Sequence, residues 1–207
     1  QVPGPGRGVD VAGEHIYFTC DDAGLLILKL DTVPPTGSIT INDGATYTTT
    51  ATVTLTLSAT DATSGIAGMR FSNDNTTYTQ WQTYTASKSW TLQEGDGIKT
   101  VYVQFRDRAN LVSTYSDTII LDTTPPTGSI TVAGGAAYTN SSSVTLTLSA
   151  EDTTSGVAQM RFSNDNLTWT PWEPYSNSKT WALPTGEGTK TVYVQFKDSA
   201  GLVSPTY

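Results

Sequence analysis

The chain has 207 residues, of which only 14% are charged, and its formal net charge at pH 7 is −8. The acidic residues are dispersed and no basic cluster is present, so we expect no binding to nucleic acid, whose phosphates require Lys and Arg. No apolar run is long enough to span a membrane, and the length predicts about two domains.

The N-terminal segment, residues 1–30, is predicted to form a β-hairpin. Residues 1–15 are rich in Pro and Gly at the start, which predicts an irregular lead-in. Apolar runs at 16–20 and 25–30 flank a Gly-containing turn, the pattern of two paired strands. Cys20 is the only cysteine, so no intrachain disulfide forms. We expect it to be a small buried apolar side chain, with a reactive or intermolecular thiol as the alternative.

The stretch GVDVAGEHIYFTCDDAGLLIL, from Gly8 to Leu28, resembles one LVIVD-type β-propeller repeat of bacterial and archaeal surface proteins. The resemblance implies that a propeller precedes this fragment in a longer parent protein. It covers about one blade, and one blade cannot close a propeller, so no propeller function carries over. The chain begins with Gln1 rather than Met, which also suggests a mature or excised piece.

An internal duplication covers the rest of the chain. The decapeptide LDTVPPTGSI at 30–39 returns as LDTTPPTGSI at 121–130, an offset of 91 residues (126 − 35). About two-thirds of the aligned positions are identical, which indicates a tandem repeat. Each Pro-Pro pair lacks backbone donors and fixes φ, so we expect a short, stiff joint that ends one β-domain and begins the next.

The first repeat, residues 31–121, is predicted to contain seven short strands. In 52–58, Val53, Leu55 and Leu57 alternate with Thr, which indicates a strand with one buried face and one solvent-exposed face. Seven strands without helical periodicity predict a Greek-key β-sandwich. The predicted strands are 37–41, 52–58, 66–71, the Tyr78/Trp81/Tyr84 segment, the Trp90/Leu92 segment, 99–106 and 117–121.

Several motifs recur in order in both repeats: DTVPP or DTTPP, a Thr-rich alternating strand, Asp-x-x-Ser-Gly, FSNDN, a Trp-containing segment and VYVQF-x-D-x-A-x-LVS. This pattern is similar to the tandem bacterial Ig-like (fibronectin-III-like) repeats of surface proteins and secreted hydrolases, and covers residues 31–207. The resemblance implies a non-catalytic extracellular spacer or adhesion module. The chain departs from it at Asn110-Leu111 and Gly201-Leu202, which replace the usual Gly-Asn of the last turn.

The fold class expected is therefore all-β, with two tandem Ig-like Greek-key β-sandwiches behind an N-terminal hairpin. The second repeat, residues 122–207, stops before the counterpart of 117–121. One explanation is that the boundary of this fragment falls one strand before the end of the domain. The other is strand donation by another chain, because 27–30 lie in the register of the absent strand and would give a head-to-tail filament. The donor residues would be Ile27, Leu28, Lys29 and Leu30.

Catalysis has little support, and we predict no enzyme. His15 is the only histidine and lies outside both repeats, so neither can contain a Ser-His or Cys-His nucleophile. Transition-metal sites need clusters of His or Cys, which the sequence lacks.

Acidic residues that recur at turns define a hypothetical Ca²⁺ site, and no other cofactor is expected. In each predicted sandwich they fall at the pole of the incoming linker, where carboxylates could supply the oxygens Ca²⁺ prefers. Asp74, Glu94 and Asp96, at the opposite pole of the first repeat, would face the second set. The alternative is that these aspartates cap their turns by hydrogen bonds. The candidate ligands are Asp61, Asp107, Asp122, Asp152 and Asp198.

The sequence offers two further kinds of candidate site. Sequons at Asn75, Asn140 and Asn166 are glycosylation candidates in a secretory pathway. Trp81 and Trp172 are expected to pack in the core or at an edge of the sandwich or, if exposed, to form a sugar-binding strip, whereas Trp90 and Trp181 are expected in the core.

We thus expect an extracellular, non-catalytic structural spacer whose partners are the other domains of its parent protein. The alternatives are a filament of identical copies and an adhesion module that binds glycans.

Overall fold

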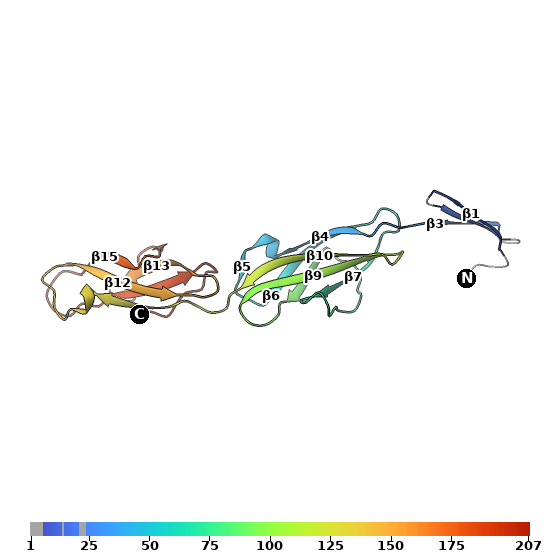
Figure 1. The fold of residues 1–207 in the computed structure, drawn as a ribbon. Coiled ribbons are helices and arrows are strands. Elements are labelled where there is room, and N and C mark those ends of the chain that lie inside the picture. The colour runs from blue at the N-terminus through green and yellow to red at the C-terminus, as the bar shows by residue number, and fades with distance from the viewer. Residues whose placement is uncertain (1–5, 14, 21–23) are drawn as a thin grey trace. The chain divides into compact units, whose positions relative to one another are not determined.

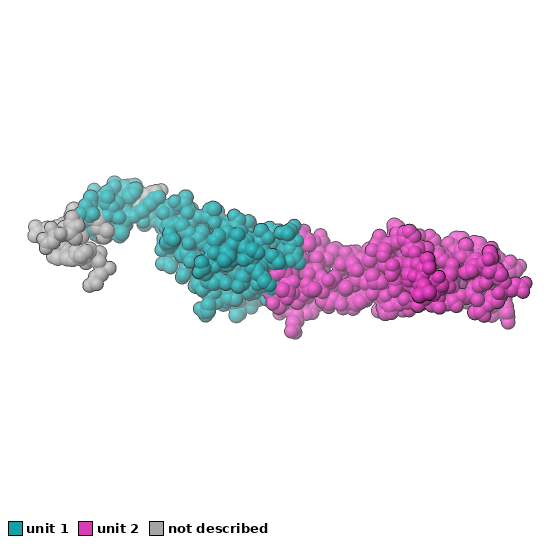
Figure 2. Space-filling view, turned by 180° about the vertical axis from the view of Figure 1, so that it is seen from behind, with its two compact units in different colours: residues 1–43, 54–90, 100–117 teal, residues 44–53, 91–99, 118–207 magenta. Residues whose placement is uncertain are grey.

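The computed structural model describes residues 6–13, 15–20 and 24–207, and all regular structure in that part is strand apart from two short 3-10 turns (Figure 1). The all-β prediction is thus confirmed. No helix among these residues is long and apolar enough to cross a membrane. The chain divides into two compact units (Figure 2). The first comprises 1–43, 54–90 and 100–117, and the second comprises 44–53, 91–99 and 118–207.

The N-terminal segment contains the predicted hairpin, which is part of a three-stranded antiparallel sheet. It contains β1 (Gly6–Ala12), β2 (His15–Cys20) and β3 (Gly24–Lys29) in the order β1-β2-β3. The irregular lead-in predicted for residues 1–15 was wrong over 6–12, because this extended stretch pairs along β2, whereas residues 1–5 and 14 lie outside the described residues. The turn at 21–23 and the side chain of Cys20 lie outside the described residues.

The first repeat contains seven strands arranged in two sheets. One sheet has the order β4-β6-β8 and the other β5-β10-β9-β7. All described pairings are antiparallel except that of β10 with β5, where Ile120 lies opposite Tyr47. The strands are β4 (Thr36–Ile41), β5 (Tyr47–Thr48), β6 (Thr52–Thr60), β7 (Ile66–Ser72), β8 (Ser87–Thr91), β9 (Gly97–Asp107) and β10 (Val112–Leu121).

Alternation of apolar and hydroxylic residues explains the burial in these strands. Val53, Leu55 and Leu57 of β6 are buried, whereas the Thr residues between them are exposed. In β9, Val101, Val103 and Phe105 have no exposed surface. Successive side chains of a strand point to opposite faces, so one face of each sheet supplies the core.

Two strand predictions needed correction. The Tyr78/Trp81/Tyr84 segment is not a regular strand, because among the described residues it has only an isolated bridge between Gln82 and Met69. The last strand begins at Val112 rather than 117, because it pairs with β9 directly after a tight turn closed by Asp107.

The second repeat is a β-sandwich of the sheets β11-β12-β15 and β14-β13-β16. Side chains from both sheets meet in one apolar core that includes Leu146, Phe162 and Phe196. The family resemblance at the level of fold is therefore confirmed. The strands are β11 (Thr127–Val132), β12 (Ser143–Glu151), β13 (Val157–Ser163), β14 (Glu173–Pro174), β15 (Ser178–Ala182) and β16 (Tyr193–Asp198).

The C-terminal residues 203–207 lie along β16. Val194 and Tyr207 exchange two backbone hydrogen bonds of 3.1 Å, and the Ser204 amide donates to Phe196. Residues 188–192 are not in a strand, whereas their counterparts 97–101 belong to β9. The difference follows from pairing, since β10 runs on to Leu121 beside β9.

Candidate functional site

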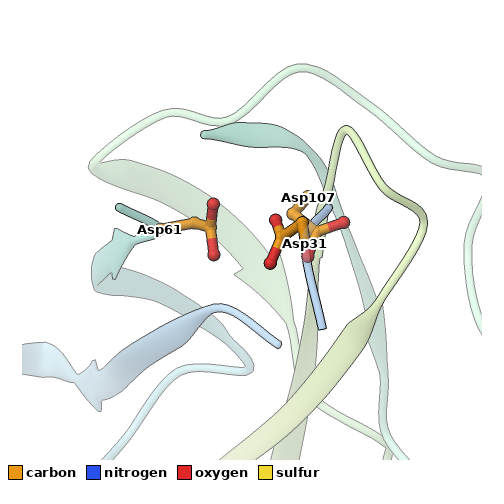
Figure 3. Close-up of side chains that lie close together, drawn as sticks. All are labelled: Asp31, Asp61 and Asp107. Carbon is orange, nitrogen blue, oxygen red and sulfur yellow. The ribbon is translucent and has the colours of Figure 1, made fainter. Parts of the chain in front are cut away.

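Three aspartates meet at one end of each repeat. In the first repeat, Asp31 lies ahead of β4, Asp61 follows β6 and Asp107 ends β9. One carboxylate oxygen of each lies within 4.8 Å of the others, and the three side chains face one another (Figure 3). We call this set the first aspartate cluster.

The second aspartate cluster contains Asp122, Asp152 and Asp198, again with one oxygen of each within 4.8 Å of the others. Its members lie at the same places in the second repeat, ahead of β11, after β12 and at the end of β16. The duplication has thus preserved the whole arrangement.

The structure brings together all five predicted acidic ligands and adds Asp31. The signal for Asp31 was present, because the offset of 91 residues places it on Asp122. Asp74, Glu94 and Asp96 belong to neither cluster, and that they face the second set stays a prediction. The carboxylate of Asp74 instead accepts bonds from its own turn, and that of Asp96 from Thr123 and Thr124.

One oxygen of each aspartate in the first cluster caps a turn, as the alternative hypothesis predicted. Asp61 Oδ1 accepts hydrogen bonds from the amides of Ser64 at 2.7 Å and Gly65 at 2.8 Å. Asp107 Oδ1 accepts one from the amide of Leu111 at 2.9 Å. Asp31 Oδ1 accepts one from the amide of Val33, two residues later.

The second cluster repeats these caps. Asp152 Oδ1 accepts hydrogen bonds from the amides of Ser155 and Gly156, both at 2.8 Å. Asp198 Oδ1 accepts one from Leu202 at 2.8 Å, and Asp122 Oδ1 one from Thr124 at 3.2 Å.

The other oxygen is left unpaired in four of the six carboxylates. These Oδ2 atoms are buried and have no hydrogen-bond partner among the residues that the structure describes; they belong to Asp31, Asp107, Asp122 and Asp198. Asp107 and Asp122 have no exposed surface at all, and Asp198 is 2% exposed. A buried, unpaired carboxylate oxygen costs free energy of folding. Turn capping therefore explains the placement of only one of the two oxygens in each of these four carboxylates.

The electrostatics of the clusters differ between the two repeats. Burial raises the pKa of Asp198, and the carboxylates of Asp122 and Asp152 raise it further against the opposing effect of two backbone amides. In the first repeat, Arg108 Nη1 donates to the carbonyl of Ser64, in the loop that Asp61 caps. The equivalent position in the second repeat is Ser199, which carries no charge.

The candidate sugar-binding aromatics lie against cations of their own chain. Trp81 is half-buried, with the guanidinium carbons of Arg70 and Arg106 at 4.6 and 4.5 Å from its ring centroid. Trp172 is similarly placed, with Arg161 at 4.5 Å and Lys197 Nζ at 4.4 Å. Glycan binding stays a prediction for these residues.

The two other tryptophans pack on buried phenylalanines. The ring centroid of Trp90 lies 5.4 Å from that of Phe71, and that of Trp181 lies 5.3 Å from that of Phe162. Trp181 packs against the core of the second repeat, as predicted.

All three sequon asparagines are exposed. Asn75 and Asn166 occupy the same turn position, with φ of 61° and 58°. Glycosylation of Asn75, Asn140 and Asn166 stays a prediction.

Comparison with protein-family models gives one match: residues 35–103 match the model of the bacterial Ig domain. No curated protein matches the chain. The N-terminal resemblance to a propeller repeat is not supported by these comparisons.

Similar solved structures include the fibronectin(III)-like modules of CbhA from Clostridium thermocellum, 14% identical, covering 82% of this chain and 90% of that one, with a TM-score of 0.46. Carbohydrate-binding modules from the β-sandwich superfamily are 12% identical over 84% and 100%, with a TM-score of 0.40. A tetra-tandem repeat in the extending region of a large adhesion protein is 14% identical over 93% and 54%, with a TM-score of 0.28. These TM-scores are too low to transfer a function.

Proposed function

We propose that the chain is a non-catalytic structural spacer of an extracellular or cell-surface protein. The observation that carries the proposal is the duplication, in which two copies of one β-sandwich sequence follow each other through the same Pro-Pro joint. The bacterial Ig match supports it for the first repeat, and the internal identity extends the likeness to the second. Domains of the parent protein on either side would be the partners.

The strand order of the first repeat suits a chain that carries load. Its first strand, β4, pairs with β6 over six residue pairs, and its last strand, β10, lies beside β9. A force applied along the chain would act on the outer ends of β4 and β10. Because this force would act parallel to the strands, several hydrogen bonds of each strand pair would have to break together.

Single-molecule force spectroscopy on the whole chain tests the proposal. We expect two separate unfolding events, each releasing about 300 Å of chain, the extended length of one repeat. Leu55→Ala and Leu146→Ala provide a matched pair, because both leucines are fully buried at equivalent positions. Each variant should weaken one event and leave the other unchanged. A chain that extends without resolvable force peaks would contradict a load-bearing role.

Strand donation between chains stays a prediction. Within its own chain, Ile27 pairs with Tyr17 and Leu28 with Ile16, and β3 lies at the edge of its sheet. Light scattering at high protein concentration distinguishes the cases, since a head-to-tail filament requires species larger than the monomer. A single monomeric species would exclude it.

A further inference from the structure

The unpaired oxygens of the aspartate clusters require a positively charged partner. Each cluster places one oxygen from each of three carboxyl groups within 4.8 Å of the others and leaves two buried Oδ2 atoms without a hydrogen bond to any described residue. Like charges at this separation repel, and burial removes the water that would screen them. A proton or a metal ion is needed to offset the charge.

The spacing of the oxygens fits Ca²⁺. Two oxygens that bind the same Ca²⁺ ion lie at most about 5 Å apart, twice the usual Ca–O distance. The oxygens of each cluster lie within 4.8 Å of one another and are therefore compatible with one shared Ca²⁺ ion. Capping of the turns by Oδ1 fixes the carboxylates of Asp107 and Asp198 so that Oδ2 is the oxygen left to bind.

We propose that each repeat binds one Ca²⁺ ion at its aspartate cluster. The ligands are Asp31, Asp61 and Asp107 in the first repeat, and Asp122, Asp152 and Asp198 in the second. Three carboxylates supply fewer than the six to eight oxygens that Ca²⁺ takes, so water or carbonyl oxygens complete its shell.

The ion would join three segments that are distant in sequence. Asp31 and Asp122 lie ahead of the Pro-Pro pairs, whereas their partners lie at the ends of strands from both sheets. A bound ion therefore fastens the entering segment to its sandwich. The consequence for stiffness rests on the proposed spacer function, but the binding itself does not.

Calorimetric titration of the metal-free whole chain with CaCl₂ is the direct test. We expect two ions per chain, and loss of one ion in each of the variants Asp107→Asn and Asp198→Asn. Asn keeps an Oδ1 atom that can accept the bond from the Leu111 or Leu202 amide, so the turn is retained. Asp165→Asn is the control, because Asp165 also caps a turn but lies in neither cluster.

Thermal melting separates binding from a structural role. At a Ca²⁺ concentration about 100 times the Kd, the Tm of the native chain should rise by about 10 °C relative to its value in EDTA. Asp198→Asn should melt in EDTA at or above the native Tm, since it removes a buried unpaired charge, and Ca²⁺ should no longer stabilise its second repeat. A residue that only caps its turn would show a lower Tm in EDTA and an unchanged response to Ca²⁺.

The proposal is overturned if no heat and no shift in Tm appear at about 10 mM CaCl₂, above the range typical of extracellular modules. It is equally overturned if the double variant Asp107→Asn/Asp198→Asn binds as many ions as the native chain. Neither result would affect the force peaks that test the spacer function.

Discussion

Asp96 accepts two hydrogen bonds from Thr123 at one carboxylate oxygen, one from the backbone amide at 3.0 Å and one from the hydroxyl at 2.8 Å. Its other oxygen accepts the hydroxyl of Thr124 at 2.6 Å. These bonds hold the pKa of Asp96 below its usual range, and the bond from the Thr124 hydroxyl has the largest effect. A loop of the first repeat, between β8 and β9, thus holds the segment that leaves β10 for β11.

Replacing Asp96 should free this segment without unfolding the repeat. In Asp96→Ala the Thr123 amide loses its acceptor, and its hydrogen exchange should accelerate by roughly 10-fold or more, as expected for a bond to a charged group. Exchange measured by NMR checks this. Glu94→Ala, two residues away at an exposed position, is the control and should leave the rate unchanged. Equal rates in Asp96→Ala and the native chain would contradict the prediction.

Gly37 should tolerate no side chain, although its backbone does not require glycine. A Cβ at this position would lie 2.6 Å from the carbonyl oxygen of Ser58 and 2.7 Å from Cε2 of Phe105. Phe105 is fully buried, so neither neighbour can move freely. Gly37→Ala should lower the free energy of unfolding by about 1–3 kcal/mol in denaturant titrations. Ser38→Ala, at the exposed neighbouring position, should change it by less than about 0.5 kcal/mol.

Asp165 should make stability depend on pH in the acid range. Hydrogen bonds from the amides of Thr168 and Leu167 and the hydroxyl of Ser163 lower its pKa from 3.8 to about 2. Because the folded-state pKa is lowered, the stabilisation is complete above the unfolded-state value and is lost as the pH falls from about 3.8 to about 2. Asp165→Asn should therefore show a smaller fall in Tm than the native chain across this interval. Parallel Tm curves would contradict the assignment.

Trp81 should contribute to stability through its cationic neighbours. Trp81→Ala removes the contacts with Arg70 and Arg106, and we expect a loss of about 1–2 kcal/mol in denaturant unfolding. Trp172→Ala, its counterpart, should behave alike. A glycan-array signal that disappears in Trp81→Ala, with stability unchanged, would contradict this and favour the carbohydrate-binding hypothesis.

Arg108 should weaken Ca²⁺ binding in the first repeat relative to the second. Its guanidinium lies on the loop that Asp61 caps, whereas Ser199 is uncharged. Arg108→Ser makes the first loop resemble the second and should lower the Kd of the first site in calorimetric titration. An unchanged Kd would show that the guanidinium does not oppose the ion.

Several features were determined by the sequence alone because they depend on local pattern. The alternation of Val53, Leu55 and Leu57 with Thr identified a half-buried strand, since side chains alternate between faces whatever the partner strand is. The offset of 91 residues likewise established two copies of one fold. The sequence-based predictions failed where strand pairing determines the structure: strand β1 and the early start of β10 both depend on neighbouring strands. The strand predicted around Trp81 was also wrong, and Trp81 instead lies outside any strand, beside two arginines.

The aspartate clusters show the same division. The sequence placed Asp61, Asp107 and their copies at turns, because short polar side chains recur there to cap backbone amides. Only the tertiary structure decided that the three carboxylates of each cluster approach within 4.8 Å and that two Oδ2 atoms in each cluster are buried with no partner among the described residues. Both depend on how the ends of β6 and β9, in opposite sheets, approach the segment ahead of β4, and no local pattern records that distance.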